Sequence, residues 1–406
     1  MNIIWITTQF PNGKENRDGM FIYRTVQELG KHYNITVLAL YPIIPPIIPM
    51  LKNFKDRKKI FSDWRNAYPK NPIVPQYIKD LNIIYVKYVR PPRINFIDIE
   101  GWFAYLSLKK YLKEYKNIQE TLIHAAWIFP AGQAAKLLSK KFNLPFIVTL
   151  MGSDVNFIRQ KTLRHFAARN IVKNASKITS VSQVLIEELI KKNVLINKDK
   201  TALTHTIYNF SKFCIKDKSK AKNGLGLEKD KRLIFFAAML RKLKNADILI
   251  KSFASLLREN YKLNLILAGS GYEEENLRRI VEQEGIVNNV KILGNIGEDL
   301  LVEYYNAADI FCLPSRNEGL PNVIVESLLC GTPVVASKVG EIPHIIKEGV
   351  NGFLVQPNSI EELKEAIKKA LDITWERNLL RESVTFLSSE KVVQEYNYVY
   401  KNILLK

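Results

Sequence analysis

Short apolar runs alternate with longer stretches of helical periodicity almost from one end of the chain to the other. The runs are rich in Ile, Val and Phe, which is typical of buried parallel strands, and the stretches between them repeat apolar residues at helical spacing. This alternation favours parallel sheets with helices on both faces. Strands are expected at residues 3–7, 35–40, 83–86, 122–125, 146–150 and 178–181, and then at 233–237, 265–268, 290–293, 309–313 and 333–336.

The helical pattern is clearest in the first half of the chain, at residues 21–32, 103–115, 131–142, 163–173 and 183–192. A chain of 406 residues is too long for one ordinary core, so two domains are expected. The polar, lysine-rich residues 212–226 are interpreted as a linker and its edges. We therefore predict domains at residues 1–208 and 209–388, followed by a C-terminal helix at 389–406 that crosses back to the first domain.

That last helix has a clear apolar pattern, formed by Val392, Val393, Tyr396, Val399 and Tyr400. Two doubly wound α/β domains in tandem would leave a cleft between the carboxyl ends of their strands, which is where ligands bind in open α/β sheets. The fold class predicted is therefore α/β, with two Rossmann-like domains facing a central cleft.

Composition narrows the class of protein. With 47% hydrophobic and 25% charged residues, the chain has the composition of a folded globular protein. Its three cysteines lack C-x-x-C spacing, so neither a disulfide framework nor a zinc site is expected. The first residues are interpreted as a strand rather than a signal peptide, and prolines interrupt the apolar residues 38–50. We expect a cytoplasmic protein, without a bound metal or cofactor.

The formal charge of +20 favours anionic partners, although a composition bias toward lysine would have the same effect. Nucleic acid is not an expected partner, because the chain lacks aromatic RNP-like strands and a helix-turn-helix. Residues 51–65 combine six basic residues with Phe54, Phe61 and Trp64. Such a segment predicts that the protein makes peripheral contact with the inner face of an anionic membrane. The alternatives are that the segment is an ordinary surface helix or that it extends over an acceptor groove.

The most informative stretch is residues 314–326, in which Glu318 and Glu326 flank a turn that opens into a helix. The preceding apolar residues form a strand, and Gly319 to Pro321 supply the turn. The free backbone N–H groups and positive dipole of a helix N-terminus bind phosphate, and a carboxylate on the same helix accepts hydrogen bonds from a ribose. A nucleotide diphosphate fits this description.

The same stretch, followed by Gly331-Thr332-Pro333-Val334-Val335-Ala336, resembles the family 4 (group 1) glycosyltransferases of the GT-B type, whose mark is E-x7-E followed by G-x-P-V-V-A. The resemblance covers nearly the whole chain. It implies that Glu318 lies beside the donor sugar and Glu326 holds the nucleotide ribose. The diphosphate would meet the backbone of Gly319, Leu320, Pro321 and Asn322.

Other residues match the family's motifs less completely. Lys244 stands at the family lysine of G-R-L-x3-K-G, while Ala238, Met239 and Asn245 replace Gly, Arg and Gly, so that Arg241 is a candidate substitute for the missing arginine. Gly19 resembles the glycine of the first-domain loop near the phosphates. In residues 149–154, Met151 replaces the histidine of T-x-H-G-x-D.

Two polar residues of the first domain remain candidates for catalysis. Asp154 is expected either at the donor sugar or as a helix cap. His124 is expected either to face the acceptor or to be a buried histidine with its hydrogen bonds satisfied. Together with Lys244, the helix end would balance the leaving diphosphate without a divalent metal.

These features predict a retaining glycosyltransferase that uses a nucleotide-sugar donor and a glycan or lipid-linked glycan acceptor, in surface polysaccharide biosynthesis. Retention and pathway rest on the resemblance alone. A nucleotide-sugar epimerase of similar architecture is one alternative. A catalytically degenerate subunit that binds nucleotide or glycan is the other, because Met151 and Met239 depart from the family pattern.

Overall fold

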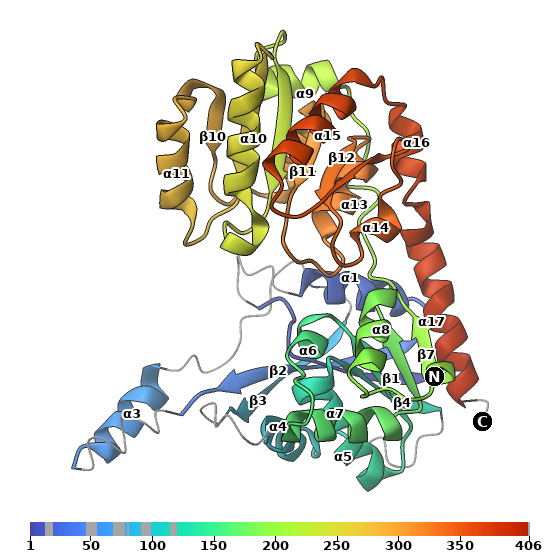
Figure 1. The fold of residues 1–406 in the computed structure, drawn as a ribbon. Helices are drawn as coiled ribbons and strands as arrows, with labels where there is room; N and C mark the ends of the chain where they lie inside the picture. Colours follow the sequence, from blue (N-terminus) through green and yellow to red (C-terminus); the bar gives the residue numbers. More distant parts are fainter. Residues whose placement is uncertain are drawn as a thin grey trace. The chain divides into compact units, whose positions relative to one another are not determined.

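The computed structural model describes residues 1–12, 19–45, 55–67, 78, 81–90, 99–113 and 120–404. The chain divides into two compact units (Figure 1). Unit 1 comprises Met1–Ile207 and Ser389–Lys406, and unit 2 comprises Tyr208–Ser388. Each unit is built on one parallel sheet with helices packed against it, which confirms the predicted fold class.

Unit 1 contains a seven-stranded sheet of order β3-β2-β1-β4-β5-β6-β7. Because β1 pairs with both β2 and β4, the chain reverses its direction of winding at the carboxyl ends of β1 and β4. The strands are β1 Asn2–Thr7, β2 Asn34–Ile43, β3 Asn82–Val89, β4 Thr121–Ala126, β5 Phe146–Leu150, β6 Lys177–Ser180 and β7 Thr201–Leu203. The helices are α1 Met20–Leu29, α3 Arg57–Ala67, α4 Glu100–Leu108, η2 Ile128–Gly132, α5 Gln133–Phe142, α6 Ser153–Asn156, α7 Leu163–Asn174, α8 Gln183–Lys191, η3 Lys198–Lys200 and α17 Ser389–Leu404.

Unit 2 repeats the plan with six strands of order β10-β9-β8-β11-β12-β13, and its winding reverses between β8 and β11. The strands are β8 Arg232–Ala237, β9 Leu263–Ala268, β10 Val290–Ile292, β11 Ile310–Leu313, β12 Val334–Ser337 and β13 Gly352–Val355. The helices are α9 Lys218–Gly224, η4 Lys242–Lys244, α10 Ala246–Arg258, α11 Glu274–Gln283, η5 Val287–Asn289, α12 Glu298–Ala307, α13 Asn322–Leu329, α14 Ile342–Ile345, α15 Ile360–Asp372, α16 Arg377–Glu382 and η6 Thr385–Leu387.

Every strand expected from the apolar pattern is present, but β7 and β13 were not expected. Each of these two strands lies at an edge of its sheet, is short, and keeps part of its surface accessible. An edge strand has only one neighbour and needs fewer apolar residues, so its sequence signal is weak.

The expected linker at residues 212–226 is partly wrong, because it contains the helix α9. Asp217 caps the helix by accepting a hydrogen bond from the backbone N–H of Lys220 at 2.6 Å. The lysines of α9 are not simply solvated: Lys218 and Lys222 pair with Asp309 at 2.8 and 3.1 Å. These ion pairs attach the segment to the start of β11.

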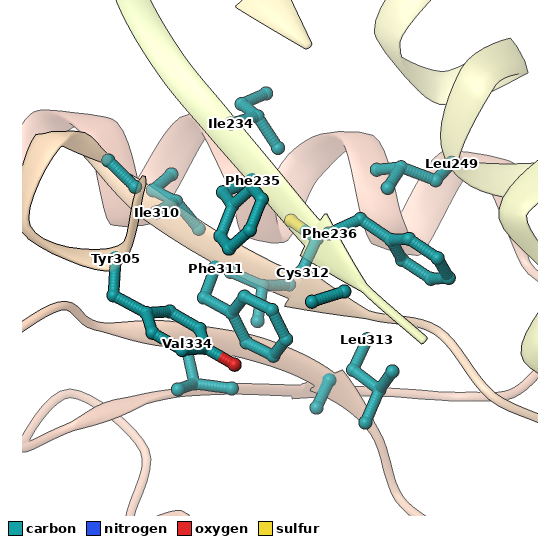
Figure 2. Close-up of a cluster of buried hydrophobic side chains, with 14 of the residues drawn as sticks. Ile234, Phe235, Phe236, Leu249, Tyr305, Ile310, Phe311, Cys312, Leu313 and Val334 are labelled. Atoms are coloured by element: carbon teal, nitrogen blue, oxygen red, sulfur yellow. The ribbon is translucent and has the colours of Figure 1, made fainter. Parts of the chain in front are cut away.

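The core of unit 2 is an aromatic cluster between the central strands and α12 (Figure 2). Phe235 of β8 and Phe311 of β11 are fully buried, and Tyr305 of α12 lies beside both, with ring centroids 5.3 and 5.4 Å away. Apolar runs without polar interruptions on these strands follow from burial of both sheet faces. The cluster fixes α12 against the end of the sheet that leads to the acidic turn.

The C-terminal helix α17 contributes to the core of unit 1. Its five predicted apolar residues are all buried there. The phenol of Tyr400 lies 2.7 Å from Nδ1 of His124, and Nε2 of the same imidazole lies 2.5 Å from the hydroxyl of Thr149. The ring also packs 3.8 Å from that of Trp5. His124 has no exposed surface, and burial lowers its pKa to about 3.

We predict that this imidazole makes unit 1 acid-sensitive. Between pH 6.5 and about 3 the unfolded chain protonates His124 and the folded chain does not, so stability falls as the pH falls. The free-energy difference between the wild type and His124→Gln, from chemical denaturation, should decrease by about 2 kcal/mol between pH 7 and pH 5. The exposed Asn402 of α17 provides the control, since Asn402→Gln changes no titratable group and should show no such change. Parallel pH profiles for wild type and His124→Gln would contradict the interpretation.

Candidate functional site

The acidic turn follows β11 and leads into α13, as predicted. Pro321 is the N-cap of this helix, and Asn322 is its first residue. The first backbone N–H groups of a helix have no partner within the helix, and they carry the positive end of its dipole. Gly319 and Asn322 are exposed, and Leu320 is half-buried. The turn therefore leaves backbone N–H groups accessible at a position where an anion could bind.

Glu318 is held by donors from two different loops. Its Oε1 accepts hydrogen bonds from Nζ of Lys244 at 2.7 Å and from the hydroxyl of Ser315 at 2.6 Å. The two charged side chains are largely withdrawn from solvent, with 9% of Glu318 and 21% of Lys244 exposed. Partial burial strengthens the ion pair and leaves little freedom to either group. The structure thus brings together two of the residues that the sequence singled out.

Glu326 lies within α13 and is contacted by Tyr305, which donates its phenolic proton to Oε2 at 3.2 Å. Burial, together with the charge of Glu326, raises the pKa of Tyr305 well above its ordinary value. The phenol is therefore protonated and acts as a donor at neutral pH. This contact fixes the carboxylate of Glu326 relative to the aromatic cluster.

The basic loop after β8 ends at Asn245, which has a left-handed backbone with φ 53° and ψ 35°. Glycine is common in this conformation, and asparagine is among the residues that tolerate it best. The replacement of the family glycine is thus conformationally conservative. The buried Asn245 amide also donates to the carbonyl of Pro314 at 2.9 Å and accepts from Nε of Arg316 at 2.6 Å. It therefore ties the basic loop to the acidic turn.

Arg241 is exposed, and no ion pair involving it is present among the described residues. Its proposed substitution for the missing family arginine stays a prediction. Met239 is 55% exposed in the same loop. The sequence analysis did not name Tyr305, Ser315 and Arg316 as residues that support the site. Only Ser315 and Arg316 could have been recognised, because they lie just after a buried strand at the point where the winding reverses.

Two further turns support this arrangement in unit 2. A Cβ atom at Gly340 would lie 2.0 Å from the carbonyl oxygen of Glu318, so only glycine allows the close approach of the two backbones. The adjacent Glu341 donates its N–H to the carbonyl of Gly319 at 3.0 Å. The loop after β9 lies against the basic loop, because the backbone N–H of Leu240 donates a hydrogen bond to the backbone carbonyl of Ser270 at 2.9 Å.

In unit 1, Asp154 acts as a bridge between the ends of two strands. Its carboxylate accepts hydrogen bonds from the backbone N–H groups of Ile128 at 3.1 Å, Met151 at 3.2 Å and Gly152 at 3.0 Å. Burial raises its pKa, and these donors oppose the rise. Asp154 is 3% exposed and joins the start of η2 to the turn before α6. It is not the N-cap of α6, which is Gly152, and its contact with the donor sugar stays a prediction.

His124 also has the environment of a buried histidine. Both ring nitrogens are hydrogen-bonded inside unit 1 and the side chain has no accessible surface, so the expectation that it faces the acceptor is not met. The physical reason is that α17 covers it. Gly19 is buried with φ 80°, and a Cβ atom would lie 2.6 Å from the backbone of Gln9. Packing alone requires this glycine, and its contact with a donor stays a prediction.

Parts of two other predictions lie outside the described residues. Residues 13–18 of the first-domain loop and residues 51–54 of the basic segment are among these, as are the side chains of Phe61 and Trp64. In the described part of the chain, no helix is long and apolar enough to cross a membrane. Within the same residues, no group of three His, Cys, Asp or Glu side chains is placed to hold a metal ion.

Sequence comparisons agree with this geometry. The model of the family "Glycosyl transferases group 1" matches residues 217–384, within unit 2, and that of "Glycosyl transferase 4-like" matches residues 79–184, within unit 1. TuaC of Bacillus subtilis strain 168, a proposed teichuronic acid biosynthesis glycosyltransferase, is 29% identical over 91% of this chain and 89% of its own length. The N-acetyl-alpha-D-glucosaminyl L-malate synthase of Bacillus anthracis is 26% identical over 70% of this chain and 75% of its own.

Solved structures show the same fold over the whole chain. Sucrose-phosphate synthase from Thermosynechococcus elongatus superimposes with a TM-score of 0.78 at 20% identity, over 100% of both chains. HepE of Anabaena, in complex with UDP, has a TM-score of 0.71 at 18% identity, over 99% of this chain and 100% of its own. With the motifs and both family models, these matches establish that the chain belongs to the group 1, family 4-like glycosyltransferases and is an enzyme of the GT-B fold.

Proposed function

We propose that this glycosyltransferase transfers a sugar from a nucleotide diphosphate donor to a hydroxyl of a glycan or lipid-linked glycan, with retention of anomeric configuration, in surface polysaccharide biosynthesis. The observation that carries the donor class is the Lys244–Glu318 pair beside the N-terminus of α13. TuaC supports the pathway through its proposed role in teichuronic acid biosynthesis, and HepE, which was solved with UDP and with UDP-glucose, supports the donor class.

Each group has a distinct task in this proposal. The backbone N–H groups of Gly319, Leu320 and Asn322 and the ammonium of Lys244 bind the diphosphate, because both present positive charge. Glu326 accepts a hydrogen bond from a ribose hydroxyl. Glu318 accepts one from the donor sugar while it keeps Lys244 in place. Asp154 holds the ends of β4 and β5, and Gly19 and Arg241 are further donor-binding candidates.

The reaction balances without a protein nucleophile. The bond between the anomeric carbon and the diphosphate oxygen breaks, and a bond from that carbon to the acceptor oxygen forms. The acceptor proton passes to the departing diphosphate. The positive groups of unit 2 stabilise the charge that develops on the leaving group, and this kind of preorganised electrostatics is often the largest contribution to catalysis.

Transfer is tested by giving the purified chain a panel of nucleotide sugars that thermal shift has first ranked, because a bound nucleotide raises stability. We expect nucleoside diphosphate release that depends on acceptor, and a glycosylated acceptor by mass spectrometry. Retention is expected as an unchanged anomeric configuration in the product's NMR spectrum. An altered sugar from donor alone would identify an epimerase. Nucleotide binding without release of diphosphate under any condition would identify a degenerate subunit.

We predict that Glu326→Ala weakens nucleotide binding by about 1–3 kcal/mol, because a charge-assisted hydrogen bond is lost. Tyr305→Phe removes only the phenolic donor to Glu326 and should weaken nucleotide binding by about 0.5–1.5 kcal/mol. Isothermal titration with the preferred nucleoside diphosphate measures both. Glu275→Ala, at an exposed position of α11, is the matched control and should bind like the wild type. Unchanged affinity in Glu326→Ala would rule out its ribose role.

We further predict that turnover does not need a divalent metal, because Lys244 and the end of α13 supply the positive charge at the diphosphate. The initial rate with the preferred donor should stay within about twofold when EDTA is added. A loss of activity in EDTA that Mg²⁺ or Mn²⁺ restores would show that the protein charges are insufficient.

A further inference from the structure

Large apolar side chains gather on the surface of unit 1 around the start of α7. Phe157, Leu163 and Phe166 are 68%, 59% and 56% exposed, although all three lie within one short stretch of the chain. Exposed apolar residues are usually scattered, and a cluster of them marks an interaction site more often than a single residue does. Together with the basic residues Arg159 and Lys161 they form what we term the α6–α7 surface.

This surface is part of the folded structure. The hydroxyl of Thr162 caps α7 by accepting a hydrogen bond from the backbone N–H of His165 at 3.2 Å. The same hydroxyl donates a hydrogen bond to the backbone carbonyl of Arg159 at 2.7 Å. His165 is buried and its ring contacts the carbonyl of Lys192 at 2.8 Å. Gln160 donates to the carbonyl of Lys191 at 3.1 Å, which attaches the loop to the end of α8. The apolar side chains are therefore displayed on a fixed scaffold.

Helical spacing determines which side chains α7 exposes. Leu163 and Phe166 are three residues apart and share its outer face, whereas His165 and Ala168 point into unit 1. Arg169 continues the exposed face one turn further. The outer face of α7 is thus apolar at its N-terminal end and basic beyond it.

The α6–α7 segment itself carries charge of one sign. The acidic residues on the adjacent helix α8 are Glu187 and Glu188, and Glu188 is paired with Lys192 at 3.4 Å. Residues 155–186 contain no Asp or Glu, and their basic residues are Arg159, Lys161, Arg164, Arg169, Lys173 and Lys177. Among the described residues, no ion pair engages Arg159, Lys161 or Arg169. An uncompensated group of cations next to apolar side chains is the combination that binds an anionic interface.

We propose that the α6–α7 surface binds an anionic phospholipid bilayer, with Phe157, Leu163 and Phe166 entering the headgroup region and the basic residues facing the lipid phosphates. The aliphatic Leu163 favours lipid over single-stranded nucleic acid, because it offers no aromatic face for a base. The contact differs from the one predicted for residues 51–65. It goes beyond the proposed function and does not depend on it, since binding to lipid is measured without turnover.

The test is co-sedimentation of the full chain with vesicles of phosphatidylcholine, alone or mixed with phosphatidylglycerol. Retention is expected on the mixed vesicles at low salt, and it should decrease as salt is added. The triple variant Phe157→Ser, Leu163→Ser, Phe166→Ser should lower the partition coefficient about tenfold or more. A second variant, Arg159→Gln with Lys161→Gln, should lower it about fivefold per charge.

The matched control replaces Tyr272, Val287 and Leu379 of unit 2 with serine, since these side chains are 73%, 58% and 54% exposed. It should bind vesicles like the wild type, and thermal melting verifies that all variants are folded. Equal losses in the control, no retention of the wild type, or retention that the variants do not change would overturn the proposal. The proposal would also be overturned if the wild type did not bind vesicles but instead self-associated in sedimentation velocity, or bound a single-stranded oligonucleotide, and the variants of the α6–α7 surface abolished that behaviour.

Discussion

The site in unit 2 depends on the ion pair between Lys244 and Glu318, which joins two loops that are 74 residues apart in the sequence. The pair forms because β8 and β11 are neighbours in parallel register, so that the loops at their carboxyl ends meet where the winding reverses. A carboxylate beside a diphosphate would repel it. Lys244 offsets the charge of that carboxylate, and the hydroxyl of Ser315 donates to the same oxygen, so the repulsion between Glu318 and an anionic ligand is reduced.

The rest of unit 2 maintains this juxtaposition. Asn245 connects the two loops through its amide, and Gly340 lets a third backbone approach the carbonyl of Glu318. The aromatic cluster (Figure 2) positions Tyr305. The phenol of Tyr305 in turn contacts the carboxylate of Glu326. Few of these contacts are between residues close in sequence. The proposed donor site therefore depends on the whole sheet, and a loss of packing at Phe235 or Phe311 is expected to displace Tyr305 and with it the carboxylate of Glu326.

This distinction explains what sequence could and could not predict. The central strands and the turn after β11 are visible because an uninterrupted apolar run followed by Gly and Pro is a local signal. β7 and β13 lie at sheet edges, where a strand has only one neighbour and needs fewer apolar residues. The helix α9 was interpreted as a linker because it is rich in lysine, and the partner of two of these lysines, Asp309, is far away in the sequence. Tyr305 looked like any core tyrosine. Asp154 and His124 were catalytic candidates because each is a polar residue at or just after a strand. Only contacts distant in sequence show that Asp154 bridges the ends of β4 and β5 and that His124 lies beneath α17.

The net charge of the chain illustrates the same limit. A bias toward lysine would spread cations evenly, and unit 2 does pair many of its own, as with Lys216 and Glu303 at 2.6 Å or Lys368 and Glu259. In residues 155–186 no acidic residue is present to do so. Because the field of unpaired cations is strongest where no acid lies nearby, the proposed membrane contact rests on where the cations of α7 lie rather than on the total charge of +20.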